Sequence, residues 1–168
     1  MPFVPISGPI VNDTVYAENQ LVAKDCDISL PEIAATLAEV RAMGKMSVPI
    51  WQMLEDMEAA ITKIGVDNGL AKMLKPEPMT IEIRFVYIKI DADNSQTNIG
   101  CKVFLRCVPK VIPSAEIKVG ESIECEVPLS VSRYEMIVDG QEQWLIDRLA
   151  GICRVDGKDY AQDIESML

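Results

Sequence analysis

The longest run of alternating apolar and polar residues covers residues 79–90, with the sequence MTIEIRFVYIKI. An alternation with a period of two places successive side chains on opposite faces of a β-strand. At ~3.3 Å per residue this strand would be roughly 40 Å long, about twice the usual length of strands in globular proteins. A strand of this length indicates a β-rich protein.

Two further segments, residues 99–108 and 122–133, alternate in the same way. Pro128 falls on the outward-facing set of the second segment. Because proline cannot donate a hydrogen bond to a neighbouring strand, Pro128 predicts a sheet edge or a bulge at this point. Residues 134–147 are predicted to form a hairpin, since they contain the Asp-Gly pair that is favoured in a type I′ turn.

Helix signals are few. Asp67 can cap a short helix that ends before Pro76, and a second short helix is expected near residues 158–166. Residues 31–44 favour a helix on propensity alone, although pairing in a sheet can override propensity. The chain is predicted to be mainly β with one or two short helices, as a small β-barrel or as two packed antiparallel sheets with a flanking helix.

No repeat, low-complexity tract or Gly/Ser linker divides the chain, so residues 1–168 are interpreted as a single domain. The start, about residues 1–16, contains three prolines and is predicted to be an extended arm with few internal hydrogen bonds. It lacks the basic region of a signal peptide, and no stretch approaches ~18 uncharged apolar residues, so no membrane span is expected. Residues 148–168 or so are expected to form a C-terminal arm with the second helix.

Charge and residue types exclude several classes of function. There are 16 Lys and Arg against 26 Asp and Glu, a net charge of −10, and no histidine. An acidic chain lacks the basic surface with which nucleic-acid-binding proteins displace counterions from phosphates. The lack of histidine removes the usual general base and the commonest metal ligand, and no phosphate-binding glycine loop occurs. We therefore expect no cofactor and no metal site.

Acidic residues are concentrated at residues 55–58 and 121–126. A carboxylate pair such as Glu124 and Glu126 could perform acid/base chemistry in a small acidic β-barrel that is a binding module or a hydrolase. A solvated acidic face explains the same pattern more simply.

The five cysteines are an odd number and form no CxxC motif, which argues against a disulfide scaffold or a zinc site. Cys101, Cys107 and Cys125 lie in the apolar phase of their strands and are predicted to be small core residues. Cys26 and Cys153 are flanked by charged residues, so they are expected to be less buried and are the better candidates for contact between subunits. Pairing of the cysteines, including pairing between chains, is the alternative to a core role.

Several segments together resemble one protein family. DISLPEIAATLAEVRAMGKMSVPIWQMLEDMEAAIT is followed by a short helix, by two long strands, by SRYEMIVDGQEQWLID and by RLAGICRVDGKDYAQDIESML. In this order and spacing they resemble the major tail tube protein of contractile-tailed bacteriophages and R-type pyocins. The resemblance covers roughly residues 20–168, and the proline-rich start departs from the family pattern.

The resemblance implies a structural virion protein of the tail tube, made in the host cytoplasm and without catalysis. It implies a small β-barrel fold of two sheets, six copies of which form a ring, and rings that stack into a hollow tube for DNA ejection. The implied partners are the chain itself, the tail sheath protein, and baseplate and tail terminator proteins, with DNA passing through the lumen without specific binding. A type VI secretion tube protein or a tube-end adaptor is the nearest alternative.

The resemblance also makes residues 31–44 a strand rather than a helix, and residues 43–55 a long loop that reaches the neighbouring ring. Exposed apolar loops mark interfaces, although such a loop can also lie on its own core. Glutamates on outward strand positions would line the lumen and repel phosphates, although net charge can serve solubility alone. Cysteines would form disulfides between subunits outside the reducing cytoplasm. The residues expected to contact the neighbouring ring are Met43, Met46, Val48, Ile50, Trp51 and Met53. Those expected to line the lumen are Glu82, Glu124 and Glu126. The cysteines that could form the disulfides are Cys26, Cys101, Cys107, Cys125 and Cys153.

Overall fold

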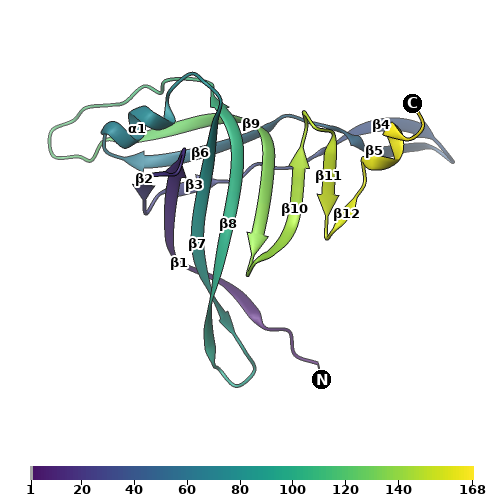
Figure 1. Cartoon of the computed structure of the whole chain (residues 1–168), viewed down its shortest axis with the longest axis horizontal. Coiled ribbons are helices and arrows are strands. Elements are labelled where there is room, and N and C mark those ends of the chain that lie inside the picture. Colours follow the sequence, from purple (N-terminus) through teal and green to yellow (C-terminus); the bar gives the residue numbers. More distant parts are fainter. Residues whose placement is uncertain (1) are drawn as a thin grey trace.

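The computed structural model describes residues 2–168, and antiparallel strands make up most of it (Figure 1). The strands are β1 (Ile6–Ala17), β2 (Gln20–Lys24), β3 (Asp27–Ser29), β4 (Ala35–Arg41), β5 (Lys45–Leu54), β6 (Met57–Ile64), β7 (Met79–Ile90), β8 (Gln96–Pro109), β9 (Glu124–Val138), β10 (Gln141–Asp147), β11 (Ile152–Val155) and β12 (Lys158–Asp159), and the helices are α1 (Asn68–Met73) and α2 (Gln162–Glu165). The predicted class, mainly β with one or two short helices, is confirmed.

Eight strands follow one another in the order β12-β11-β10-β9-β8-β7-β1-β2, and β6 and β3 branch from β9. The two ends of this row, β2 and β12, do not pair with each other, so the sheets do not close into a barrel. The barrel that we expected from the sequence is therefore wrong for the single chain. Two packed antiparallel layers with a flanking helix describe it better.

Strand β9 belongs to both layers. On the side away from β8, residues 124–131 pair with β6, whereas residues 133–138 pair with β10. A register shift between Arg106 and Cys107 of β8 lies at this changeover, and a bulge bends a strand and increases its twist. As a result, β6 and β3 pass behind β1, β7 and β8 (Figure 1).

The core lies between these layers and consists of the inward-facing sets predicted by the alternation. Each fully buried aliphatic side chain contributes roughly 1.5–3 kcal/mol relative to an exposed one. Helix α1 covers one end of the core with Leu70 and Met73. The largest buried side chains are Met57, Ile61, Met73, Ile81, Ile83, Leu105, Leu129 and Ile146.

Three local predictions are confirmed. Residues 124–128 pair with β6 but have no partner on β8, so Pro128 lies in an edge segment. Asp139 and Gly140 have φ values of 51° and 76°, and a type I′ turn requires positive φ at both central residues. Asp67 caps α1 by accepting a hydrogen bond from the amide of Leu70.

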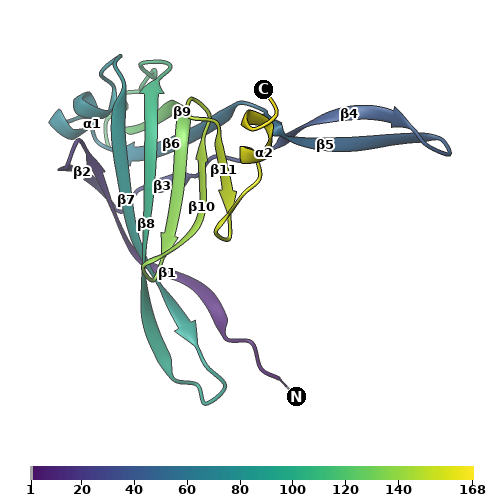
Figure 2. The same ribbon diagram turned by 45° about the vertical axis from the view of Figure 1, so that its right-hand side comes forward.

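The prediction for residues 31–55 needs two corrections. Residues 35–41 form strand β4, as the resemblance implies, and not the helix that propensity favours. The expected loop over residues 43–55 is also wrong, because residues 45–54 form strand β5 and pair with β4 in a twisted hairpin (Figure 2). The pairing satisfies backbone groups that a loop would leave to water, and Met43 and Gly44, with φ of 51° and 120°, make the turn.

The N-terminal segment is extended, as predicted, but most of it is a hydrogen-bonded strand of the sheet and not an arm with few internal hydrogen bonds. Strand β1 pairs with β7 from Ile6 to Ala17, so only residues 2–5 precede the sheet. The register shifts between Ser7 and Asn12, where Pro9 has no amide hydrogen to offer. The C-terminal segment, residues 148–168, contains β11, β12 and α2. Neither helix in the described part of the chain is long and apolar enough to cross a bilayer.

Candidate assembly surfaces

The hairpin of β4 and β5 projects from the body of the molecule (Figure 2). Met43 is fully exposed, Met46, Trp51 and Met53 are exposed by between 44% and 58%, and Val48 and Ile50 are half-buried. The structure therefore brings all six residues of the predicted ring contact together on one ribbon. An isolated two-stranded ribbon is marginally stable in water, and contiguous exposed apolar side chains mark an interface.

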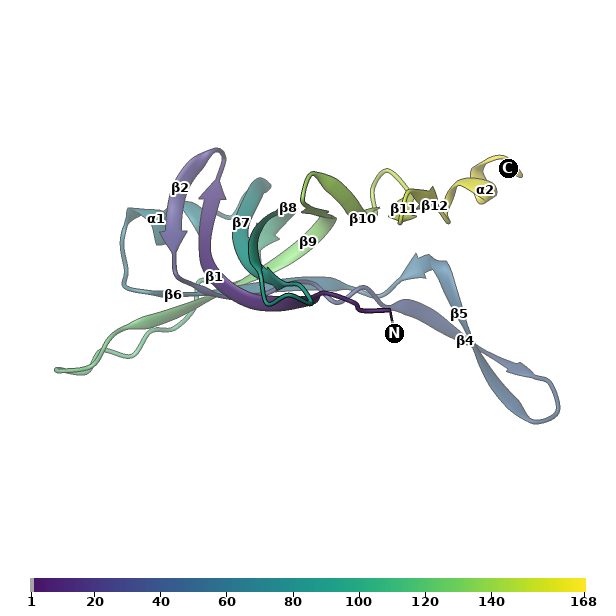
Figure 3. The same ribbon diagram turned by 90° about the horizontal axis from the view of Figure 1, so that it is seen from below.

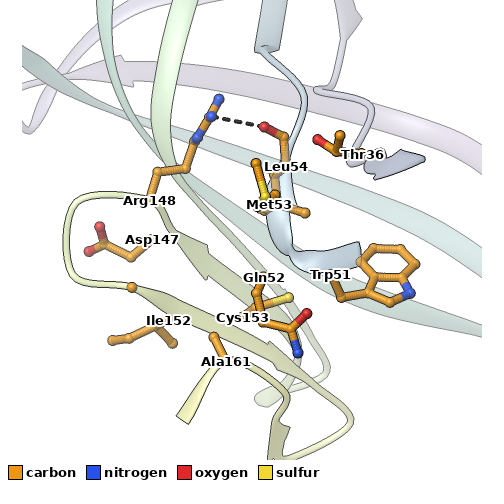
Figure 4. Close-up of a pocket in the computed structure, with 11 residues that line it drawn as sticks. Thr36, Trp51, Gln52, Met53, Leu54, Asp147, Arg148, Ile152, Cys153 and Ala161 are labelled. Carbon is orange, nitrogen blue, oxygen red and sulfur yellow. Dashed lines mark hydrogen bonds between the residues drawn. The ribbon is translucent and has the colours of Figure 1, made fainter. Parts of the chain in front are cut away.

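The base of this hairpin is tied to the segment that follows β10 (Figure 4). Arg148 donates from Nη2 to the carbonyl of Leu54 at 2.9 Å and from Nη1 to the carbonyl of Glu55 at 3.1 Å. Gln52 on β5 donates to the carbonyl of Tyr160 at 3.4 Å. These residues border a cavity of about 290 Å³, with Trp51, Met53 and Cys153 among its lining. The contacts fix the direction in which the hairpin leaves the body.

A second surface lies at the opposite end of the long axis, in the connection between β8 and β9 (Figures 1 and 3). Residues 110–123 form no helix or strand, and four of their aliphatic side chains are exposed: Val111, Ile112, Ile117 and Val119. Connections of this length without secondary structure are uncommon in compact domains and are often functional. This surface was not predicted from the sequence, in which the length of the segment and its aliphatic residues were the available signals.

This connection borders an open concavity of about 530 Å³ on the layer formed by β6 and β9. Glu124 and Glu126 stand on its β9 side, opposite Ile64 and Thr62 of β6, and both glutamates are exposed. The rest of the lining is Thr62, Val111, Pro113, Ser114 and Pro128.

Glu82, the third glutamate predicted for the lumen, lies elsewhere. Its cross-strand neighbours are Tyr16 on β1 and Phe104 on β8. Only 12% of its side chain is exposed, and it accepts a hydrogen bond from Arg84 Nε at 2.7 Å. The guanidinium of Arg84 lies 4.5 Å from the centre of the Tyr16 ring. Glu82 therefore lies on the outer face of β7, as predicted, but its carboxylate is covered and paired and not free, and the three glutamates do not share one surface.

Four of the five cysteines are buried, and all five are free thiols. Cys107 and Cys125 belong to the hydrophobic core, as predicted, and Cys101 is buried too. Cys153 was expected to be accessible, but pairing of β11 with β10 turns it inward, and it is 3% exposed. Burial raises the pKa of the Cys107 thiol to about 12. Only Cys26 is partly accessible, so the predicted disulfides between subunits would have to use it.

Among the side chains that the structure describes, no group of three Cys, Asp or Glu could hold a metal ion. The two projecting segments instead present apolar side chains from opposite ends of the molecule, an arrangement suited to repeated contact between copies.

A model of the family described as phage tail tube protein FII matches residues 9–168, nearly the whole chain. The chain belongs to the phage tail tube protein FII family. A comparison with curated proteins found no match. The resemblance deduced from the motifs is thereby confirmed, and the protein is a structural component of the virion tail tube. Tail tube proteins assemble with themselves and with other tail components, so the hairpin and the residue 110–123 connection are candidate assembly surfaces of a tail tube subunit.

Proposed function

We propose that this tail tube protein forms hexameric rings, and that the rings stack into the hollow inner tube of a contractile tail through which DNA passes during ejection. The observation that carries the proposal is the projecting hairpin of β4 and β5, whose exposed apolar side chains are not covered by the rest of the chain.

Ring formation is supported by the open row of strands. Strands β2 and β12 stand at its two ends, and within the described residues neither pairs with a further strand, although Lys63 donates to the Val22 carbonyl of β2. Unpaired strand edges are templates for pairing with another chain, and closing the row between subunits removes them. A head-to-tail contact that closes by rotation gives a ring.

Ring stacking is supported by the hairpin. A second head-to-tail contact, one that does not close, produces a filament. The apolar residues of β4 and β5, with Met43 at the tip, are suited to this contact because they project away from the core.

The net charge of −10 suits a conduit for DNA. An acidic wall repels phosphates and offers no counterion-release affinity. A lumen role for Glu124 and Glu126 stays a prediction, and Glu82 contributes less because Arg84 pairs with it. The tail sheath protein would surround the tube, and baseplate and tail terminator proteins would bind its ends.

Electron microscopy of the purified protein at increasing concentration tests the proposal. We expect annuli with six subunits and stacked tubes, and a high copy number in the intact particle. A variant in which residues 38–50 are replaced by a short turn should form rings without stacking, whereas removal of residues 2–5, which precede the sheet, should leave tubes intact. A full-length protein that stays monomeric at every concentration would contradict the proposal, and a copy number of one or a few rings would indicate a tube-end adaptor instead.

A further inference from the structure

Strands β5 and β6 cross the molecule almost without interruption. Only Glu55 and Asp56 separate them, so together they span residues 45–64, which corresponds to roughly 65 Å of extended chain. The hairpin tip lies at one end of this path (Figure 3), and Thr62, near the other end, lines the concavity beside β6 and β9. Two unpartnered surfaces of different chemistry are therefore held at opposite ends of one element.

The tip of the hairpin presents one exposed apolar side chain, that of Met43, between two cationic residues, Arg41 and Lys45. Met43 is fully exposed in the turn, which the amide of Ala42 closes by donating to the carbonyl of Gly44 at 3.0 Å. Arg41 and Lys45 face each other across the turn. Lys45 lies 3.7 Å from Glu39, but both side chains are more than half exposed, and such pairs contribute little. Arg41 forms no ion pair with the described residues. The tip therefore presents positive charge on an acidic protein.

The concavity has the opposite charge. Pro113 and Pro128 give its floor an apolar character without amide donors, while Glu124 and Glu126 are exposed at its side. The lysines of the residue 110–123 connection and of β6 are already paired within the chain: Lys110 with Glu58, Lys118 with Glu116, and Lys63 with Asp67.

We propose that the hairpin tip of one copy inserts Met43 into this concavity on the next copy, with Arg41 and Lys45 facing Glu124 and Glu126. The inference rests on the proposed function, because it names the surface that receives the hairpin. Two tips repel each other and so do two concavities, so charge selects the head-to-tail contact. Because donor and acceptor lie at opposite ends, the contact is head-to-tail, and such a contact builds a filament when the rotation between copies does not close. It places both glutamates between copies and not in the lumen.

Charge reversal tests this contact. The double variant Arg41→Glu/Lys45→Glu should reduce sedimentable tubes about tenfold or more, since like charges across an interface are strongly unfavourable. Glu124→Lys/Glu126→Lys should do the same, and the chain carrying all four substitutions should recover most of the assembly. A control that also reverses two charges, but keeps the net charge, is Lys75→Glu/Glu77→Lys on the exposed segment after α1, which should leave assembly unchanged. Circular dichroism verifies that each variant is folded.

The outcomes separate the two proposals. If the natural protein forms no rings or tubes, the proposed function is wrong. If the natural protein forms tubes and both charge-reversal variants form them equally well, only the concavity is wrong as the surface that receives the hairpin. The lumen role of Glu124 and Glu126 then stays a prediction.

A crosslink provides a second measurement that does not depend on charge. The pair Met43→Cys/Val111→Cys, oxidised after tube formation, should give a ladder of covalent multimers on a non-reducing gel. The pair Met43→Cys/Leu21→Cys, which uses an exposed residue on β2, should give none. Absence of the ladder from the first pair would overturn the inference.

Discussion

Lys63 Nζ lies 2.6 Å from Asp67 Oδ1, and the same ammonium group donates to the carbonyl oxygen of Val22 at 2.8 Å. Asp67 in turn accepts the amide of Leu70 and caps α1. Lys63 is 8% exposed, and a buried charge is tolerated only when it is paired and hydrogen-bonded. Lys63 therefore links β6, α1 and β2 at the end of the core that α1 covers.

Lys63→Met should destabilise the protein by about 1–3 kcal/mol. The methionine fills similar space but leaves the Val22 carbonyl without its buried donor and removes the partner of Asp67. The matched variant is Lys72→Met on α1, whose exposed ammonium donates to Gln20 Oε1 at 2.7 Å, and it should change stability by less than about 0.5 kcal/mol. Urea unfolding of both variants measures the difference; equal effects would show that the Lys63 contacts carry little energy.

Gly69→Ala should destabilise the protein, although alanine is more favourable than glycine inside a helix by about 1 kcal/mol. An added Cβ would lie 2.3 Å from the Val22 carbonyl oxygen and 2.9 Å from Lys63 Nζ, so the backbone of β2 must move. Overpacking of this kind costs about 1–3 kcal/mol. Gly100→Ala is the control, because no atom lies within 4 Å of its Cβ position. Thermal unfolding that ranks Gly100→Ala as the less stable variant would contradict the close approach seen at Gly69.

In the Asp67→Asn variant, the free energy of unfolding should fall less steeply than in the natural protein as the pH is lowered. The hydrogen bonds from Lys63 and from the Leu70 amide lower the pKa of Asp67. A group whose pKa is lower in the folded state stabilises it above the ordinary pKa, near 4, and this stabilisation disappears as the pH falls through the lowered value. Urea midpoints measured between pH 2 and pH 6 should fall less steeply for Asp67→Asn than for the natural protein. Parallel curves would show that Asp67 does not contribute to the acid transition.

Thiol labelling should distinguish Cys26 from the other four cysteines. The thiolate is the reactive form, and burial raises the pKa of Cys107 to about 12. At pH 8 a thiol reagent should modify one cysteine in the native protein and five after unfolding, as counted by mass spectrometry. Cys26→Ser should abolish native labelling and any covalent dimer on non-reducing gels of intact particles. Dimers that persist in Cys26→Ser would show that a buried cysteine becomes accessible in the tube.

Arg148→Ala should loosen the hairpin of β4 and β5 without unfolding the sheet. The substitution removes the two hydrogen bonds to the carbonyls of Leu54 and Glu55. Hydrogen exchange of residues 45–54 should accelerate, since local opening requires fewer contacts to break. Arg154→Ala, which removes a pair with Glu142 on the neighbouring strand, should leave exchange of the hairpin unchanged.

The long strands were predictable because one physical pattern defines them. The bounds expected for residues 79–90 coincide with those of β7, since alternation with a period of two reports which side chains are buried. The Asp-Gly turn after β9 and the Asp67 cap could be predicted equally well, because both depend on residues that are neighbours in the sequence.

The rest depended on contacts that the sequence does not reveal locally. Residues 31–55 contain good helix formers, yet they pair as a hairpin, which shows tertiary pairing overriding propensity. The pattern placed Glu82 on the outer face correctly, but it could not show that Tyr16 and Phe104 flank it there. The residue 110–123 connection has no periodicity at all, so its position opposite the hairpin emerged only from the fold.

The continuity of β5 and β6 affects how a tail subunit bears load. A pull on the hairpin is transmitted along one backbone to the far end of the molecule, where eight residue pairs with β9 resist it together. The two strands lie along the direction of the force and the hydrogen bonds between them lie across it, so these bonds would have to shear together and cannot be unzipped one after another. A tube joined end to end through this path would pass tension from copy to copy through strands that resist stretching, which suits the inner tube of the contractile tail proposed above.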